Sequence, residues 1–147
     1  MSKETYDTNI FISRKRKEES LPDSFYMSVV VLQELVVGAQ DITEVKVLNA
    51  ARKEYEKAGR LLVPTAEDWW EVGRIIYLLQ HGQKAGNKGL TPKISAKEKY
   101  RITNDVFIAR TARRAGVTVV TDNTADFELI RPYCAVKTVS AREYFGS

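Results

Sequence analysis

Apolar and polar positions along the first part of the chain predict short strands that run into helices. Residues 6–12, Y-D-T-N-I-F-I, fit a short strand leading into a turn or a helix, with Asp7 and Asn9 near its end. Residues 25–31, F-Y-M-S-V-V-V, begin as a strand. The apolar residues that follow recur at helical spacing, with Ser28 placed to cap the helix. Each strand is therefore expected to feed directly into a helix.

The middle of the chain continues this alternation. Residues 42–58 place apolar side chains at helical spacing on a polar background, and Gly59 supplies a stop. Residues 60–64 then fit a short buried strand, and Thr65-x-x-Asp68 resembles a capping box that opens another helix.

The last part of the chain predicts a long loop followed by two further strands. Residues 81–97 are rich in glycine and lysine and predict the loop, and residues 104–115 predict a helix. A β-branched strand at 117–121, a short helix at 124–131 and a strand at 135–139 complete the pattern. Strands that alternate with helices pair in parallel, so the predicted fold is α/β, with a central parallel sheet flanked by helices. In such sheets ligands bind beyond the carboxyl ends of the strands.

Length and composition limit the class of protein. The chain has 147 residues, which predicts a single domain at 1–147, and its 44% hydrophobic and 29% charged residues are typical of a soluble protein. It holds no apolar run near the roughly 20 residues that span a bilayer and no apolar signal segment, so no membrane association and a cytoplasmic location are expected. One cysteine, Cys134, and one histidine, His81, provide neither an internal disulfide nor a Cys/His zinc site.

The charge distribution suggests one class of partner. The net charge of +4 favours a polyanion, and basic residues concentrate at 14–17 and at 84–101. Charge runs alone are also explained by two solvated surfaces, and that alternative stays open here.

Carboxylates are the residues best placed for chemistry. The chain lacks a Ser/His/Asp arrangement and a phosphate-binding loop of the G-x-x-x-x-G-K-[ST] type. Asp7 is expected at a strand end, Asp105 in the first turn of a helix, and Asp126 in the short helix after a strand. Each of the last two is also explained by the helix macrodipole alone. Glu34 borders the apolar side of its helix, where a cation would relieve the cost of its burial. Oxygen ligands without His or Cys suit magnesium or manganese.

Four segments resemble the successive motifs of the PIN domain and follow the same order. They are Y-D-T-N-I-F-I at 6–12, S-V-V-V-L-Q-E-L-V-V-G-A at 28–39, N-D-V-F-I-A-R-T-A at 104–112 and V-V-T-D-N-T-A-D-F at 119–127. Within this family the chain is most similar to the VapC-type toxins of bacterial toxin–antitoxin pairs. The resemblance implies a parallel α/β fold, a magnesium or manganese site and hydrolysis of RNA phosphodiesters.

The resemblance also assigns roles to individual residues. Asp7, Glu34 and Asp105 match the first three acids of the family. Asp126 is taken as the fourth, in preference to Asp122. Asp7, Asp105 and Asp126 are the expected metal ligands, and the residues expected to support them are Thr8, Asn9, Thr121 and Asn123.

The function implied is that of a magnesium-dependent endoribonuclease acting as the toxin of a type II pair. A cognate antitoxin protein and a homodimer are the expected protein partners. The RNA backbone is expected to contact the basic loop, through Lys84, Lys88, Lys93 and Lys97. Two alternatives are a catalytically degenerate PIN-like module that binds RNA or protein, and an aspartyl-phosphate enzyme. The second lacks the acidic neighbour it needs, because Thr8 and Asn9 follow Asp7.

One aromatic group has two interpretations. Trp69, Trp70, Ile76 and Tyr77 fall in one predicted helix, where they form either an interface or part of the core. Aromatic side chains at helical spacing more often lie in a core, so a core position is the prediction.

Overall fold

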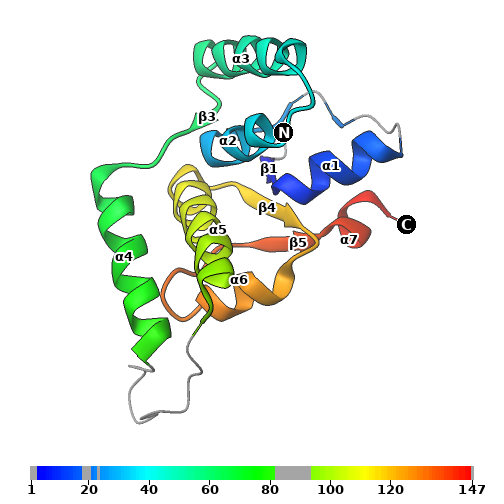
Figure 1. The fold of residues 1–147 in the computed structure, drawn as a ribbon. Coiled ribbons are helices and arrows are strands. Elements are labelled where there is room, and N and C mark those ends of the chain that lie inside the picture. The colour runs from blue at the N-terminus through cyan, green and yellow to red at the C-terminus, as the bar shows by residue number, and fades with distance from the viewer. Residues whose placement is uncertain (1–2, 18–20, 23, 82–93, 147) are drawn as a thin grey trace.

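The computed structural model describes residues 3–17, 21–22, 24–81 and 94–146. These residues form short parallel strands alternating with helices (Figure 1). The strands are β1 (Glu4–Tyr6), β2 (Met27–Ser28), β3 (Leu61–Leu62), β4 (Thr118–Thr121) and β5 (Thr138–Ser140). The helices are α1 (Thr8–Arg16), α2 (Val29–Val37), α3 (Ile42–Lys57), α4 (Ala66–His81), α5 (Ala96–Ala115), α6 (Thr124–Ile130) and α7 (Ala141–Phe145).

Every pair of strands in the described residues is parallel. One sheet has the order β1-β4-β5 and the other pairs β2 with β3. A bridge between Thr5 and Tyr26 links the two sheets. This confirms the predicted α/β fold. Because the strands run the same way, the residues that follow Tyr6, Ser28 and Thr121 meet at one edge.

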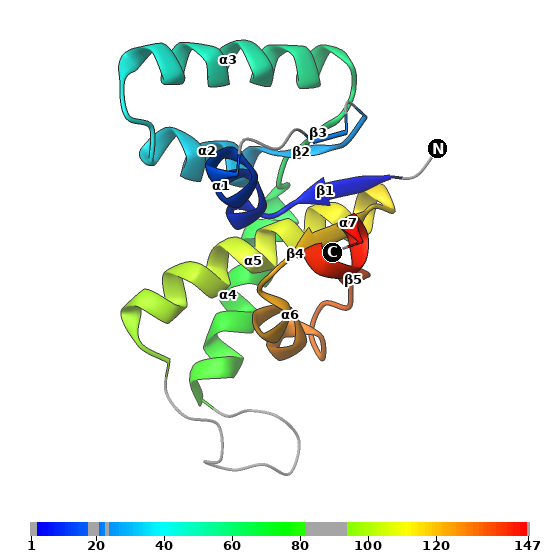
Figure 2. The ribbon, with the colours of Figure 1, turned by 90° about the vertical axis from the view of Figure 1, so that its right-hand side faces the viewer.

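Helices pack around the sheets in two groups (Figures 1 and 2). Helix α2 packs on α3, while α4 packs along α5, and in both views α3 lies at the opposite end of the molecule from the last turns of α4. Helix α5 is central, since it contacts α2, α4, α6 and β4. Its side chains Ile102, Val106, Ile108, Ala109 and Ala112 are fully buried. No helix in the described part of the chain is long and apolar enough to cross a membrane.

Local signals at several helix ends are confirmed. Ser28 caps α2 by accepting hydrogen bonds from the backbone of Val30 and Val31. Thr65 and Asp68 form reciprocal side-chain to backbone bonds of 2.8 and 3.2 Å at the start of α4. Gly59 follows α3 with φ of 71°, a conformation that favours glycine.

Two element boundaries differ from the prediction. Residues 6–12 were predicted to hold a short strand that leads into a turn or a helix, but β1 starts earlier, at Glu4, and ends at Tyr6, because the next residue, Asp7, caps α1. Helix α5 begins at Ala96, whereas residues up to 97 were expected in a loop. Its start is fixed by a capping box of Ser95 and Glu98. The residue types of this box are a helix-start signal in the sequence, next to the lysine-rich stretch that predicts a loop.

The predictions for the C-terminus and the aromatic group need correction. The last strand lies at Thr138–Ser140 and is followed by α7, which was not predicted. Of the four aromatic or apolar side chains in α4 expected in the core, only Ile76 is buried. The exposed fractions of the others are 65% for Trp69, 73% for Trp70 and 52% for Tyr77. The ring of Trp69 lies edge-on to Phe107 of α5, with 4.5 Å between the ring centroids, yet most of its surface faces solvent.

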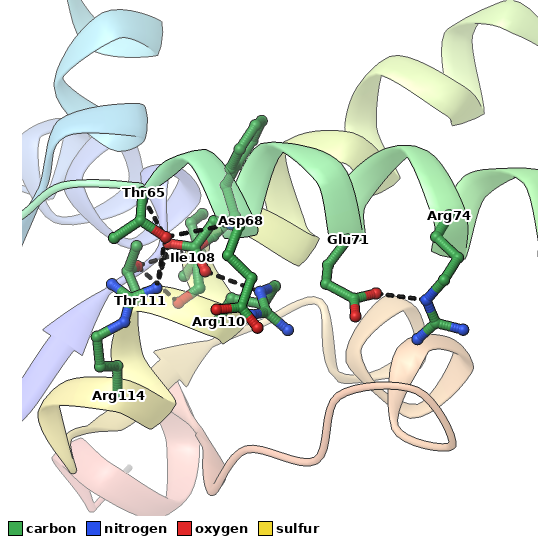
Figure 3. Close-up of polar contacts among 10 residues, drawn as sticks. Thr65, Asp68, Glu71, Arg74, Ile108, Arg110, Thr111 and Arg114 are labelled. Atoms are coloured by element: carbon green, nitrogen blue, oxygen red, sulfur yellow. Dashed lines mark hydrogen bonds and ion pairs between the residues drawn. The ribbon is translucent and has the colours of Figure 1, made fainter.

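An ion-pair cluster joins α4 to α5 (Figure 3). The carboxylate of Asp68 is fully buried and accepts hydrogen bonds from Arg110, at 2.8 Å, and from Arg114. Burial alone would raise the pKa of Asp68, but the Thr65 backbone and the two guanidinium groups outweigh it and hold the pKa below its usual range. We call Asp68, Arg110 and Arg114 the Asp68 cluster.

Candidate functional site

Asp7 lies at the edge where β1 ends and α1 begins. Its carboxylate accepts a hydrogen bond of 2.8 Å from the backbone N–H of Thr8 and another of 2.8 Å from the hydroxyl of Thr121. The Asp7 N–H also donates to the carbonyl of Val120, which fixes the end of β1 against β4. Burial raises the pKa of Asp7 in spite of these two donors.

Asp105 lies near the middle of α5 and faces the same edge of the sheet. Asp105 is only 4% exposed. Burial is the main cause that raises its pKa to about 9, and the negative charges of Asp7 and Asp126 add to it. The expected position in the first turn of a helix is wrong, since α5 starts at Ala96, so the macrodipole does not explain this acid.

Asp126 enters from the first turn of α6. It accepts a hydrogen bond of 2.6 Å from the side-chain amide of Asn123, and the same amide lies 3.4 Å from Asp105. Arg101 donates to Asp126 through Nε at 2.5 Å and Nη2 at 3.3 Å. Burial by itself raises the pKa of Asp126, but the bonds from Arg101 and Asn123 outweigh it and bring the pKa below its usual range.

Glu34 joins the group from α2. It is half-buried, and its carboxylate accepts a hydrogen bond of 2.7 Å from the hydroxyl of Thr8. Thr8 therefore contacts two acids, Asp7 through its backbone and Glu34 through its side chain. Four elements, β1–α1, α2, α5 and β4–α6, thus contribute to one acidic site, which we define as Asp7, Glu34, Asp105 and Asp126.

The residues expected to support the acids are not equally placed. Thr8, Thr121 and Asn123 each donate a hydrogen bond to an acid of the site. Asn9 is exposed, and the described residues give it no hydrogen bond to Asp7. Thr121 also accepts from the backbone N–H of Asn123 at 2.8 Å, so the end of β4 organises both sides of the site.

Basic residues near the site include Arg101, which the sequence marked only as the end of the basic stretch at 84–101. Lys97 is exposed in the first turn of α5, while Lys84, Lys88 and Lys93 lie outside the described residues. Arg101 forms an ion pair with an acid of the site, Asp126. Arg101 lies four residues before Asp105, a spacing that places both side chains on one face of a helix. The spacing points to the site only because α5 begins before Arg101, at Ala96.

The donor chemistry of the acidic site fits a hard divalent cation. In the part of the chain that the structure describes, no three acidic, His or Cys side chains are arranged as a ready-made metal site. Instead the carboxylates accept hydrogen bonds from Thr8, Thr121, Asn123 and Arg101. A cation would relieve the like-charge repulsion and desolvation that raise the pKa of Asp7 and Asp105. Mg²⁺ and Mn²⁺ are the ions that such oxygen ligands suit.

Comparison with known proteins agrees with this architecture. The model of the PIN domain family matches residues 6–131. No curated protein sequence matches the chain significantly. Among solved structures, a chain of VapBC-1 from nontypeable Haemophilus influenzae has a TM-score of 0.54 at 20% identity, covering 94% of this chain and 97% of that chain. FitAcB from Neisseria gonorrhoeae gives 0.56 at 21% identity, with 92% and 95% covered.

A third solved structure extends the same likeness. DNA-bound VapBC from Salmonella typhimurium has a TM-score of 0.53 at 22% identity, covering 95% of this chain and 98% of that chain. At these identities the likeness shows a shared fold over almost the whole length of each chain.

Proposed function

This chain belongs to the PIN-domain family, and we propose that it is a magnesium- or manganese-dependent endoribonuclease that acts as the toxin of a type II toxin–antitoxin pair. PIN domains are generally nucleases, and they generally use divalent metal ions. The observation that carries the proposal is the burial of Asp105 beside Asp7 and Asp126, three acids from separate elements at one sheet edge. Three acids held this close together lower the stability of the folded chain, and a bound cation would compensate their charge.

Each residue of the site has a task in this proposal. Asp7, Asp105 and Asp126 would hold the ion, and Glu34 would complete the negative surface around it. A bound divalent ion supplies Lewis-acid activation of water and neutralises charge on the phosphodiester. Thr8, Thr121 and Asn123 fix the directions of the carboxylates through the hydrogen bonds described above.

The substrate is proposed to be RNA held by basic residues at the entrance to the site. Lys97 is the described member of the expected group Lys84, Lys88, Lys93 and Lys97, and it is exposed on α5. Contacts of this kind go to phosphates, so they would weaken as salt is raised.

The proposed antitoxin surface is an apolar groove between α2 and α3. It has a volume of about 470 Å³ and is lined mainly by aliphatic side chains, among them Val29, Leu32, Val36, Val45 and Leu48. The solved structures of similar fold include VapBC and FitAB, and three of them are described as bound to DNA. Helix α2 also carries Glu34, so the groove and the acidic site share one helix.

A homodimer remains part of the proposal. Three exposed aromatic side chains on α4 form an apolar surface that a dimer would bury away from water. They are Trp69, Trp70 and Tyr77. They lie on a different helix from the groove.

The test is metal-dependent RNA cleavage by wild type, Asp105→Asn and Asp122→Asn. Asp122 is an exposed acid four residues before Asp126 in the motif at 119–127, so its variant is a matched control for the loss of one charge. Asp105→Asn is expected to lower magnesium-dependent cleavage by about a thousandfold, because it removes a ligand, and Asp122→Asn to change it by less than about threefold.

The rival is a degenerate PIN-like module that binds RNA or protein without cutting. It predicts RNA binding by the wild type with neither cleavage nor heat on titration with Mn²⁺. Cleavage that survives Asp105→Asn unchanged would refute the proposed mechanism, since the assigned site would then be idle.

A further inference from the structure

Arg101 pairs with an acid of the site and at the same time is partly exposed to solvent. It lies on α5, one helical turn before Asp105, so both side chains project from the same face. Its guanidinium donates two hydrogen bonds to Asp126, which is 25 residues away in the sequence. The side chain of Arg101 is 46% exposed, whereas that of Asp126 is only 10% exposed. Arg101 therefore lies over the solvent side of an acid in the site.

We propose that Arg101 is a substrate-binding residue that exchanges Asp126 for a phosphate of the RNA when a divalent ion binds. The inference rests on the proposed function, because it assumes that Asp126 is a metal ligand. The Asp126 oxygens that accept from Arg101 are those an ion would bind. Asn123 also holds Asp126, at 2.6 Å, so the carboxylate stays oriented after the guanidinium leaves.

The guanidinium group of Arg101, once released from Asp126, is suited to bind a phosphate. A guanidinium is always charged, and its planar fork matches two oxygens of a carboxylate or of a phosphate. The phosphodiester being cut must approach the ion held by the acids, and it brings two non-bridging oxygens to the same place. Arg101 needs only a side-chain movement to follow, because it is half exposed and is anchored on the helix that carries Asp105.

The neighbouring lysines on α5 divide into two kinds. Lys97 is four residues before Arg101 and shares its face, so it extends a basic row away from the acids. Lys99 is also exposed, but a separation of two residues turns it to the other side of the helix. Lys99→Ala therefore removes the same charge from the same turn without touching the proposed phosphate position, and it is the matched control.

The experiment measures two quantities in wild type, Arg101→Ala, Arg101→Lys and Lys99→Ala. The first is the affinity for a short single-stranded RNA with phosphorothioate linkages, measured in Mn²⁺ over a range of salt. The second is the affinity for Mn²⁺ alone, measured by calorimetry without RNA. Thermal melting confirms that each variant is folded.

The expected result separates the variants. Arg101→Ala is expected to bind the RNA at least tenfold more weakly and to lower the slope of log K against log salt by about 0.7, the value for one phosphate contact on a single strand. Arg101→Lys keeps the slope but recovers only part of the affinity, because it lacks the fork. Lys99→Ala changes neither quantity by more than about twofold, and Arg101→Ala binds Mn²⁺ at least as tightly as the wild type.

Two results would overturn the inference. If Arg101→Ala has the same salt slope as Lys99→Ala, Arg101 makes no phosphate contact. If Arg101→Ala loses tenfold or more in Mn²⁺ affinity, Arg101 instead holds Asp126 in place for the ion. Failure of the proposed function looks different, because the wild type itself would then show neither Mn²⁺ binding nor RNA cleavage.

Discussion

Two buried aspartates on neighbouring helices, Asp68 on α4 and Asp105 on α5, have opposite environments. Asp68 is fully buried, but two guanidinium groups and a backbone N–H hold its pKa below the usual range (Figure 3). Asp105 is almost as buried, yet burial and the negative charges of Asp7 and Asp126 raise its pKa to about 9. Burial alone thus does not mark a functional carboxylate. The difference lies in whether the protein supplies the compensating charge.

This comparison explains why one cluster stabilises the fold and the other does not. A buried carboxylate paired with arginines joins two helices, and its charge is satisfied without any ligand. A buried carboxylate beside other carboxylates destabilises the folded chain unless a cation or a proton is bound. Without a bound cation or proton, the acidic site is therefore expected to weaken the fold, and the proposed ion would reverse that effect.

The largest expected effect is the loss of stability on breaking the Asp68 cluster. Asp68→Asn removes the charge that Arg110 and Arg114 share, and Arg110 is the more buried of the two, with 20% of its side chain exposed. We expect the free energy of unfolding, measured by urea denaturation, to fall by about 3 kcal/mol.

Glu71→Gln is the matched control for this experiment. It breaks the ion pair of Glu71 with Arg74 one turn further along α4, and it is expected to cost less than about 1 kcal/mol (Figure 3). Equal losses in the two variants would show that the Asp68 cluster acts as an ordinary surface pair.

The next effect is a pH dependence of stability that comes from Asp105. Its pKa is about 9 in the folded chain and about 3.9 in an unfolded chain, so the folded state binds the proton more tightly. The protonated carboxyl group of Asp105 therefore contributes to the free energy of unfolding. This contribution is fully present below about pH 4 and is lost as the pH rises toward 9. In EDTA, the melting temperature of the wild type is expected to fall by several degrees between pH 5 and pH 9.

Asp105→Asn isolates the contribution of this one carboxyl group. The variant should lose the part of the pH dependence that comes from Asp105, because an amide does not titrate in this range, while the part that comes from the raised pKa of Asp7 should remain. Asp68 does not interfere, since its lowered pKa leaves it ionised throughout. Parallel pH profiles for wild type and Asp105→Asn would assign the dependence to other groups.

The smallest expected effect concerns the support of the acids by Asn123. Its amide donates to Asp126 at 2.6 Å and lies 3.4 Å from Asp105, so it spaces two proposed ligands. Asn123→Ala is expected to weaken Mn²⁺ binding by about tenfold, measured by calorimetry, with little change in stability. Asn9→Ala, at an exposed position, should leave the affinity unchanged. If both variants bind Mn²⁺ as the wild type does, Asn123 has no role in orienting the acids.

The sequence by itself determined the features that depend on neighbours a few residues apart. Ser28, Gly59 and the Thr65–Asp68 pair set helix ends through bonds that span two to four residues. The alternation of strands and helices then implied parallel pairing, which brought the residue after β1 and the residues after β4 to one edge. The four acids were selected from these positions and from the order of the motifs. Even the start of α5 was present locally, in Ser95 and Glu98.

Only the tertiary structure decided how the charges are paired. The bond between Arg101 and Asp126 spans 25 residues, and that between Arg110 and Asp68 spans 42. No local pattern distinguishes an arginine that neutralises a buried acid from one that faces water. The exposure of Trp69 and Trp70 has the same origin, because helical spacing gives the face of a side chain but not what packs against it. Charge compensation and burial are properties of the assembled helices, and they separate the acid that stabilises this fold from the acids proposed to bind an ion.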